Sequence, residues 1–183
     1  NDSVDSSLKF PWLDRADKAK AIAVIPCGFE FDELVNQRPI NAAKHYSARG
    51  FLVFYVAWQW SPEDRLSKRG EVFPGVIQVP LYDFLKGYEA ISLQGRVGHY
   101  VLTMPARQFT ETVDKWRSKG GVVIYDIMDE WEEFCRVGQA PWYNKNVEKE
   151  LLLKADYVSA VSPGLKKKFQ CVRSDIAVIG NGY

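Results

Sequence analysis

Three carboxylates follow a strand that the sequence predicts to be buried. Residues 122–126, Val-Val-Ile-Tyr-Asp, form an apolar run that ends in Asp126, and Asp129 and Glu130 follow shortly after it. A central parallel strand is covered on both faces, and charged side chains stay out of such places unless something pairs with them. We therefore expect these carboxylates to face a cleft at the carboxyl end of the strand.

A carboxylate in such a cleft can act as a general base. It must lie at the reacting hydroxyl, and removal from water raises its pKa towards the working pH. Asp126 and Asp129 are three residues apart, so one could face a substrate while the other orients it. In the structural alternative, either aspartate caps the following turn or pairs with Arg107 or Arg136.

The elements that must position these residues alternate between strands and helices. The predicted strands span residues 20–26, 51–57, 76–79, 99–104, 122–126, 157–161 and 176–179. The predicted helices span residues 39–49 and 144–155, the stretch from Pro105 to the Gly120-Gly121 pair, and a short stretch after Ser162-Pro163. Residues 58–75 and 81–97 are expected to carry short helices and loops. This order predicts an α/β fold, a Rossmann-like three-layer sandwich with a mostly parallel sheet.

In such a sheet, ligands bind outside the carboxyl ends of the strands, near the point where the strand order switches. That rule nominates five loops: Cys27-Gly28-Phe29, Trp58-Gln59-Trp60, Pro105-Ala106-Arg107, residues 126–131, and Ser162-Pro163-Gly164.

Each of these loops also has a structural interpretation. Gly28 serves either a tight turn or the close approach of a phosphate or sugar, and neither a dinucleotide fingerprint nor a P-loop motif accompanies it. Trp58 and Trp60 either pack under a loop or stack on a sugar or an acyl chain. Ser162 before Pro163 is typical of a helix N-cap.

Composition excludes several classes of partner. The 183 residues carry 24 basic and 23 acidic side chains, a net charge of +1, so no global charge attracts nucleic acid or an anionic membrane. Cys27, Cys135 and Cys171 lack the paired spacing of a zinc site, and we expect buried, inert thiols in a reducing cytosol.

The sequence predicts one folded domain over residues 19–180. Residues 1–18 are expected to be a flexible segment, because their opening Asn-Asp-Ser-Val-Asp-Ser-Ser is polar. This opening is also unlike a signal peptide. No apolar stretch approaches the roughly 20 residues that a membrane span requires.

Four segments of the second half resemble a known family. They are Tyr125-Asp126-Ile127-Met128-Asp129-Glu130-Trp131, residues 148–161, Ser162-Pro163, and the closing Ile179-Gly180-Asn181-Gly182. Their order is similar to that of the N-terminal half of GT-B glycosyltransferases, above all the retaining family 4 ("group 1") enzymes of bacterial polysaccharide synthesis. In that family, a strand ends in a Tyr-Asp-x-x-Asp type motif, and an Asn-Gly pair marks the crossing into a second domain. The resemblance covers about the last sixty residues, and earlier segments match only in element order.

The resemblance implies that this domain binds the acceptor. A C-terminal domain with a Glu-x7-Glu motif would bind the nucleotide-sugar donor, and residues 181–183 would begin the linker to that absent domain. Gly28 would approach the donor phosphates. Asp129 is the first candidate for the catalytic carboxylate and Asp126 the second, although Met128 stands where many members have a histidine. The further candidates for substrate binding are Gly28, Phe29, Trp58, Trp60, Arg107, Glu130 and Ser162.

We expect no required cofactor or metal, with a nucleotide sugar as co-substrate and a glycan or lipid-linked acceptor. The expected location is the cytoplasm, where contact with the inner face of the plasma membrane stays open, and no nucleic acid is expected as a partner. The fragment alone is expected to be inactive. Two alternatives remain: a GT-B sugar-nucleotide epimerase, and a Rossmann-like binding domain without catalysis.

Overall fold

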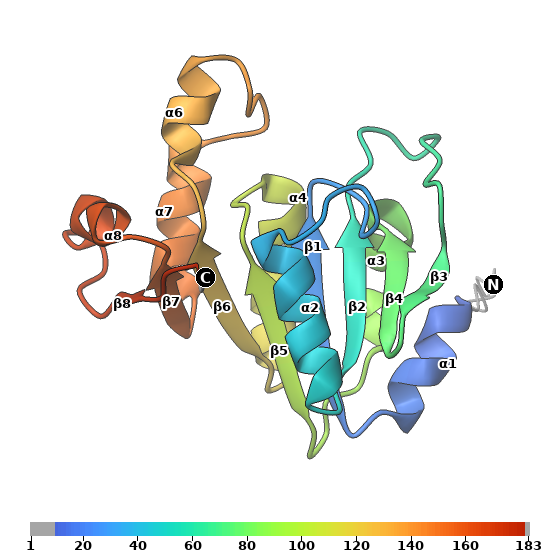
Figure 1. Ribbon diagram of the computed structural model, residues 1–183. Coiled ribbons are helices and arrows are strands. Elements are labelled where there is room, and N and C mark those ends of the chain that lie inside the picture. Colours follow the sequence, from blue (N-terminus) through green and yellow to red (C-terminus); the bar gives the residue numbers. More distant parts are fainter. Residues whose placement is uncertain (1–9, 182–183) are drawn as a thin grey trace, which may run out of the picture.

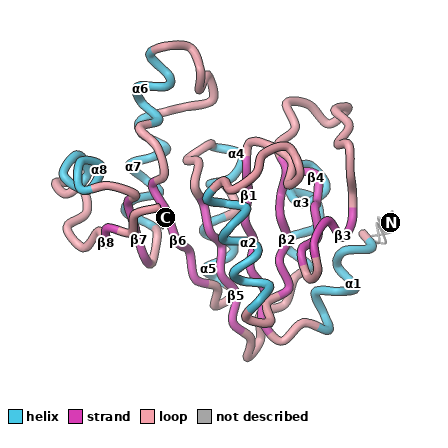
Figure 2. The backbone as a smooth tube through the Cα atoms, in the orientation of Figure 1, coloured by secondary structure: helices cyan, strands magenta, loops and turns pink. Residues whose placement is uncertain are grey.

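The computed structural model describes residues 10–181 and has one eight-stranded sheet (Figures 1 and 2). The strand order across the sheet is β3-β4-β2-β1-β5-β6-β7-β8. The strands are β1 (Ala21–Cys27), β2 (Leu52–Ala57), β3 (Gly70–Phe73), β4 (Val76–Pro80), β5 (Val97–Leu102), β6 (Val122–Ile127), β7 (Tyr157–Ala160) and β8 (Ala177–Val178). The predicted α/β class, a Rossmann-like sandwich with a mostly parallel sheet, is confirmed.

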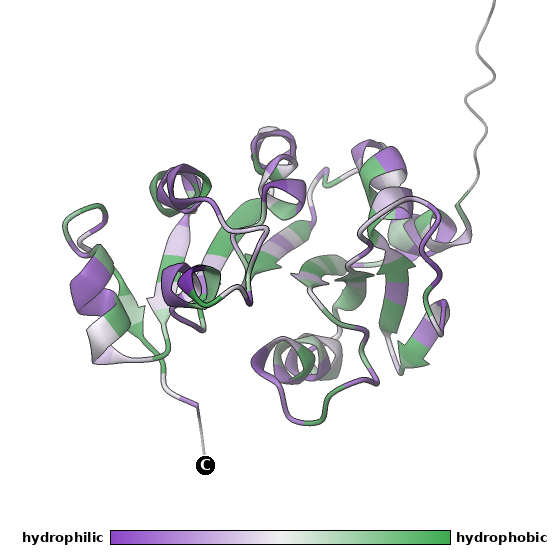
Figure 3. Ribbon diagram, turned by 90° about the horizontal axis from the view of Figure 1, so that it is seen from above, coloured by the Kyte–Doolittle hydropathy of each residue, from purple (hydrophilic) through white to green (hydrophobic). Residues whose placement is uncertain are grey.

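Helices lie on both sides of the strands, as the end-on view of Figure 3 shows. They are α1 (Pro11–Lys18), α2 (Arg38–Ala48), α3 (Leu81–Gly87), the 3-10 turn η1 (Tyr88–Ala90), α4 (Arg107–Thr110), α5 (Val113–Ser118), α6 (Trp131–Arg136), α7 (Lys145–Lys154) and α8 (Pro163–Phe169). Between residues 10 and 181, none of them combines the length and the apolar character that crossing a bilayer requires.

The strand order reverses at β1, the first strand of the chain. From β1 the chain adds β2, β4 and β3 on one side, then returns to place β5, β6, β7 and β8 on the other. All neighbouring strands run parallel except β3 and β4, which form an antiparallel pair. The switch point therefore lies between β1 and β5, and ligands are expected at the carboxyl edge close to it.

Two apolar clusters cover the two faces of the sheet, because neighbouring residues of a strand point to opposite sides. On one face, Ala23 and Ile25 of β1 pack with Ile40 and Ala43 of α2. On the other face, Ile22 and Val24 belong to the larger cluster, which includes side chains of α1, α3, α5, α7 and α8. Strand β6 is buried only on the second face, since its residues alternate between half-buried and buried.

The structure corrects the prediction for the part of residues 1–18 that it describes. Pro11–Lys18 form helix α1, with Pro11 in the first turn, and Trp12 and Ala16 are buried four residues apart. Trp12 packs edge-on against Phe54 of β2, with ring centroids 5.2 Å apart. Hydrophobic burial outweighs the polar start of the segment, whose residues 1–9 lie outside the described residues.

Three further elements differ from the predictions. Strand β3 lies where short helices and loops were expected, helix α6 lies where no element was predicted, and the helix predicted from Pro105 onward is divided into α4 and α5. At the division, buried Thr112 donates its hydroxyl to Tyr100 Oη (2.9 Å) and lies 3.3 Å from the Phe109 carbonyl. Tyr100 Oη in turn donates to the Phe109 carbonyl (3.0 Å), and a side-chain donor at such a carbonyl competes with helical hydrogen bonding.

The cysteines follow the prediction only in part. Cys27 is buried, and its burial raises the pKa of the thiol to about 11, so it is inert near neutral pH. Cys135 is half-buried and Cys171 is exposed, so the prediction of buried thiols is wrong for these two. Both lie in or after short helices, α6 and α8, that leave much of their surface in water.

Candidate functional site

A cavity of about 720 Å³ lies at the carboxyl edge of the sheet. Three segments that are distant in the sequence form it: the start of α2, the residues after β6, and the residues after β8. The last of these lies beside β7, because Ile179 N–H donates to the Ala160 carbonyl (2.9 Å), and Figure 1 shows β7 and β8 next to each other. The lining residues are Asn36, Gln37, Arg38, Asn41, Met128, Asp129, Gly180 and Asn181.

Asp126 is held by an ion pair at the edge of this cavity. Arg38, the first residue of α2, donates from Nε and Nη2 to the two carboxylate oxygens, at 2.5 and 2.9 Å. Ser159 of the neighbouring strand β7 donates to Asp126 Oδ1 (2.7 Å). The side chains of Asp126 and Arg38 are only 13% and 16% exposed. Asp126 thus forms the ion pair of the structural alternative, but its partner is Arg38 rather than Arg107 or Arg136.

Arg38 also fixes the segment that follows β8. Its Nη2 donates to the Ile179 carbonyl (2.8 Å), and its Nη1 donates to Asn181 Oδ1 (3.1 Å). One guanidinium therefore ties together α2, β6 and the last described residues. Such a planar, forked donor suits a role in positioning several acceptors at once.

Asp129 differs from Asp126, because its carboxylate has no hydrogen bond or ion pair to any residue between 10 and 181. It is half-buried and lines the cavity. Removal from water raises the pKa of its carboxyl group above the ordinary value of 3.8. An accessible carboxylate with a raised pKa is the usual form of a candidate general base.

Glu130 does not line the Asp129 cavity and belongs instead to a cluster of charged side chains. Its carboxylate pairs with Lys168 of α8, which also contacts Glu132 of α6 at 2.9 Å. Lys168 is therefore paired and partly buried, although it belongs to a run of three lysines in α8. The cluster fastens α6 to α8.

Gly28, Phe29 and Trp58 lie together, but in a second and smaller cavity of about 270 Å³ at the ends of β1 and β2. A Cβ atom at Gly28 would lie 2.9 Å from Sδ and Cε of Met104, the far end of a flexible side chain, so a small shift of Met104 would accommodate it and packing alone does not require glycine here. Trp58 packs edge-on against Phe109 and Trp60, each with ring centroids 5.2 Å away, and Trp60 is 66% exposed. Neither tryptophan lines the Asp129 cavity.

The two remaining predicted residues lie elsewhere. Arg107 begins α4 and lines a cavity of about 180 Å³ against α7. Ser162 caps α8, because its hydroxyl accepts a hydrogen bond from Leu165 N–H (3.3 Å), so the predicted N-cap is confirmed. Neither residue lines the cavity around Asp129.

Sequence reasoning missed the side chains that α2 brings to the cavity. Asn36, Gln37, Arg38 and Asn41 end the β1–α2 loop and start the helix, whereas only the first residues of that loop had been nominated. A signal was present in the sequence, because an asparagine, which favours turns, stands three residues before Pro39, which suits the first turn of a helix. In the structure, Asn36 has a φ of 59°, a left-handed conformation that asparagine tolerates better than most residues, and Gln37 follows as the N-cap residue of α2.

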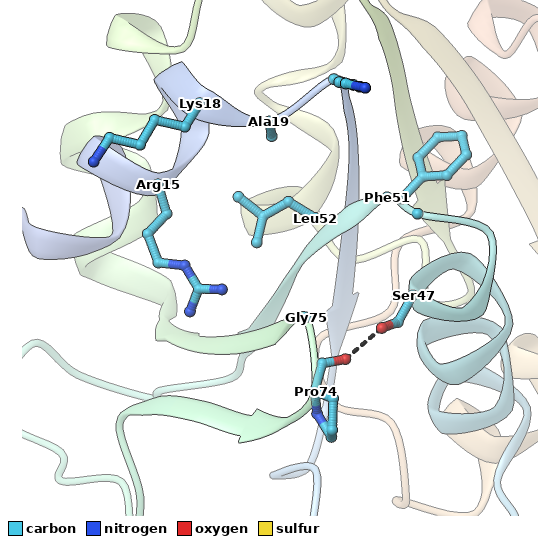
Figure 4. A pocket seen from close by; sticks show the side chains of 10 residues that line it. Arg15, Lys18, Ala19, Ser47, Phe51, Leu52, Pro74 and Gly75 are labelled. Atoms are coloured by element: carbon cyan, nitrogen blue, oxygen red, sulfur yellow. Dashed lines mark hydrogen bonds between the residues drawn. The ribbon is translucent and has the colours of Figure 1, made fainter.

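Among residues 10–181, the carboxylates that line the other cavities are either exposed or paired, and none of these cavities has a half-buried carboxylate without a partner. A cavity of about 570 Å³ at the opposite edge of the sheet is lined by Arg15 and Lys18, but Figure 4 shows these two side chains pointing in different directions. Its marked hydrogen bond joins Ser47 to the Pro74 carbonyl and is structural. In the described part of the chain, no three His, Cys, Asp or Glu side chains gather in a way that could hold a metal ion.

Comparison with protein-family models and with curated proteins finds no match for this chain. The arguments for its function therefore rest on its residues, its fold and the geometry of the cavity.

Proposed function

We propose that this chain is the acceptor-binding domain of a GT-B glycosyltransferase that takes its sugar from a nucleotide-sugar donor. The observation that carries the proposal is Asp129, a half-buried carboxylate without a protein partner among the described residues, which opens into a cavity at the carboxyl edge of a Rossmann-like sheet. Ligands of such sheets bind at that edge. The likeness of residues 125–131 and 148–161 to family 4 enzymes supports the same function.

In the proposed mechanism, Asp129 accepts the proton of the acceptor hydroxyl as that oxygen attacks the donor sugar. Desolvation raises the pKa of Asp129 and so brings it closer to that of the hydroxyl, which favours proton transfer. Asp126 is a positioning residue in this proposal, because its carboxylate is already engaged by Arg38 and Ser159. Charge on the departing diphosphate would be neutralised by groups of the proposed donor-binding domain.

The proposed donor also bears on location. Nucleotide sugars are cytoplasmic metabolites, and we expect the domain to work in the cytoplasm on a glycan or lipid-linked acceptor of polysaccharide synthesis. Whether it also contacts the inner face of the membrane is a separate question, which fractionation of cells expressing the full-length protein would answer.

The test is transfer by the full-length protein, assayed with a set of nucleotide sugars and cell-surface glycan acceptors. Asp129→Asn removes the base without changing the size of the side chain, and we expect kcat to fall by about a hundredfold or more. The matched control is Asp114→Asn, an exposed carboxylate that pairs with Lys154 at 2.9 Å, away from the cavity.

Residues 1–183 alone are expected to transfer nothing, since the proposal assigns donor binding to another domain. Near-normal turnover of Asp129→Asn would remove Asp129 from the catalytic role. Transfer by residues 1–183 alone would contradict the division between acceptor and donor domains.

A further inference from the structure

The charges around the Asp129 cavity can be accounted for one by one. Among the described residues, Arg38 is the only basic one in the lining, and its Nε, Nη1 and Nη2 groups already donate to Asp126, Ile179 and Asn181. Four of the five donors of a guanidinium are used in these bonds. Between residues 10 and 181, the cavity therefore has no basic side chain ready to bind an anion.

The described side chains around the cavity carry a net negative charge. The charges of Arg38 and Asp126 cancel within their ion pair, so the carboxylate of Asp129 leaves one formal negative charge. The amino end of α2 also faces the cavity and is equivalent to about half a positive charge. That partial charge does not balance Asp129, and the local potential stays negative.

The remaining polar groups are neutral carboxamides. Asn36, Gln37 and Asn41 line the cavity, and their side chains make no hydrogen bond within residues 10–181. A carboxamide offers both a donor and an acceptor, which are the groups that a hydroxyl needs in return. Three carboxamides and one open carboxylate thus form a surface suited to several hydroxyl groups.

We infer that this cavity binds an uncharged, polyhydroxylated ring and discriminates against anions such as uronic acids and phosphate. The inference rests on the proposed function, whose acceptor it narrows to a neutral sugar at this position. Asp129 accepts a hydrogen bond from one ring hydroxyl, and the carboxamides of the α2 start contact the others. A carboxylate or phosphate on the same ring would meet the unpaired charge of Asp129.

The experiment measures binding to residues 1–183 by the shifts of the backbone amide resonances of Asp129, Gly180 and Asn181. The probes are the methyl glycosides of glucose, galactose and mannose, their uronic acid counterparts, and inorganic phosphate. Each glycoside and its uronic acid differ in one group, so their ratio of affinities isolates the effect of charge. We expect at least one neutral glycoside to shift these resonances and its uronic acid to bind about tenfold more weakly.

Two variants test the electrostatic reason. Asp129→Asn removes the unpaired charge and should bring the ratio of the affinities for the neutral glycoside and its uronic acid close to one. Asp126→Asn releases the guanidinium of Arg38 from its partner and should favour the uronic acid over the neutral glycoside. Asp114→Asn changes charge by the same amount outside the cavity and should leave the ratio unchanged.

The inference is overturned if the uronic acids or phosphate bind as well as the neutral glycosides, or if no glycoside shifts the cavity resonances. The same result from Asp129→Asn and Asp114→Asn would also overturn it. These outcomes are independent of the transfer assay. If the cavity prefers neutral glycosides but the full-length protein transfers no sugar, the proposed glycosyltransferase function is contradicted and the inference about the cavity stands. If the full-length protein transfers sugar to an acidic acceptor bound in the cavity, the proposed function stands and the inference about the cavity is contradicted.

Discussion

Two neighbouring residues of strand β6, Tyr125 and Asp126, lie on opposite faces of the sheet, and a carboxylate has a different environment on each face. Tyr125 points into the closed side of the sheet, where its hydroxyl donates to Glu148 (2.6 Å). Asp126 points to the opposite side, where it meets Arg38 at the edge of the open cavity. One residue of separation thus divides an interior cluster from a candidate binding site, since a strand alternates its side chains.

The two environments treat a carboxylate differently. Glu148 is 2% exposed and accepts from two phenols, with Tyr143 Oη at 3.0 Å, and its burial raises the pKa of the carboxyl group. Asp126 instead has a guanidinium partner. The closed cluster holds α7 against β6, whereas the open pair positions the walls of a cavity. Asp129 belongs to the open side and lacks a partner there, which is why we assign chemistry to it.

The largest effect on stability is expected from breaking the Arg38–Asp126 pair. Arg38→Gln leaves the Asp126 carboxylate largely removed from water without its cation, and we expect a loss of about 3 kcal/mol in the free energy of unfolding. Denaturant unfolding measures this loss. The control is Lys154→Gln, which breaks the exposed pair with Asp114 and should cost less than about 1 kcal/mol. Equal losses in the two variants would show that Arg38 does not hold the cavity together.

A smaller, pH-dependent effect is expected from Glu148→Gln. The folded protein holds the proton of Glu148 above the ordinary pKa of 4.5, so this residue favours folding at low pH, and that contribution is lost as the pH rises through the raised pKa. The variant has no such group. Its free energy of unfolding relative to the wild type should therefore increase as the pH rises from about 4.5 through the raised pKa.

The comparison needs an exposed glutamate on the same helix. Glu150→Gln on α7 provides it and should show no such trend. A difference between Glu148→Gln and the wild type that is constant with pH would mean that Glu148 titrates normally. The closed cluster would then be no different from the surface.

The smallest effect is expected at Ser162, which was a candidate for substrate binding. Its cap bond to Leu165 N–H is long, so Ser162→Ala should lower the free energy of unfolding by only about 0.5 kcal/mol. Transfer by the full-length protein should keep its KM, because Ser162 does not line the Asp129 cavity. A raised KM with unchanged stability would return Ser162 to the substrate-binding residues.

Local patterns were enough to predict most of the sheet. Strands β1, β2, β4, β6 and β7 form where apolar runs lie between glycine, proline and polar residues, within one or two residues of the predicted ends. Strand β3 and helix α6 were missed for a local reason as well. The four residues of β3 are only half-buried or exposed, and α6 buries none of its residues, so neither carries an apolar period.

By itself, the sequence determined that carboxylates would stand at the end of β6, at the carboxyl edge of the sheet, where folds of this class bind their ligands. It did not decide which carboxylate would be free. That depended on Arg38, which lies 88 residues from Asp126 and reaches it only because α2 packs on the same face of the sheet. Periodicity is a property of neighbouring residues, whereas an ion pair depends on how distant layers meet. Only the tertiary structure could therefore separate the paired Asp126 from the open Asp129.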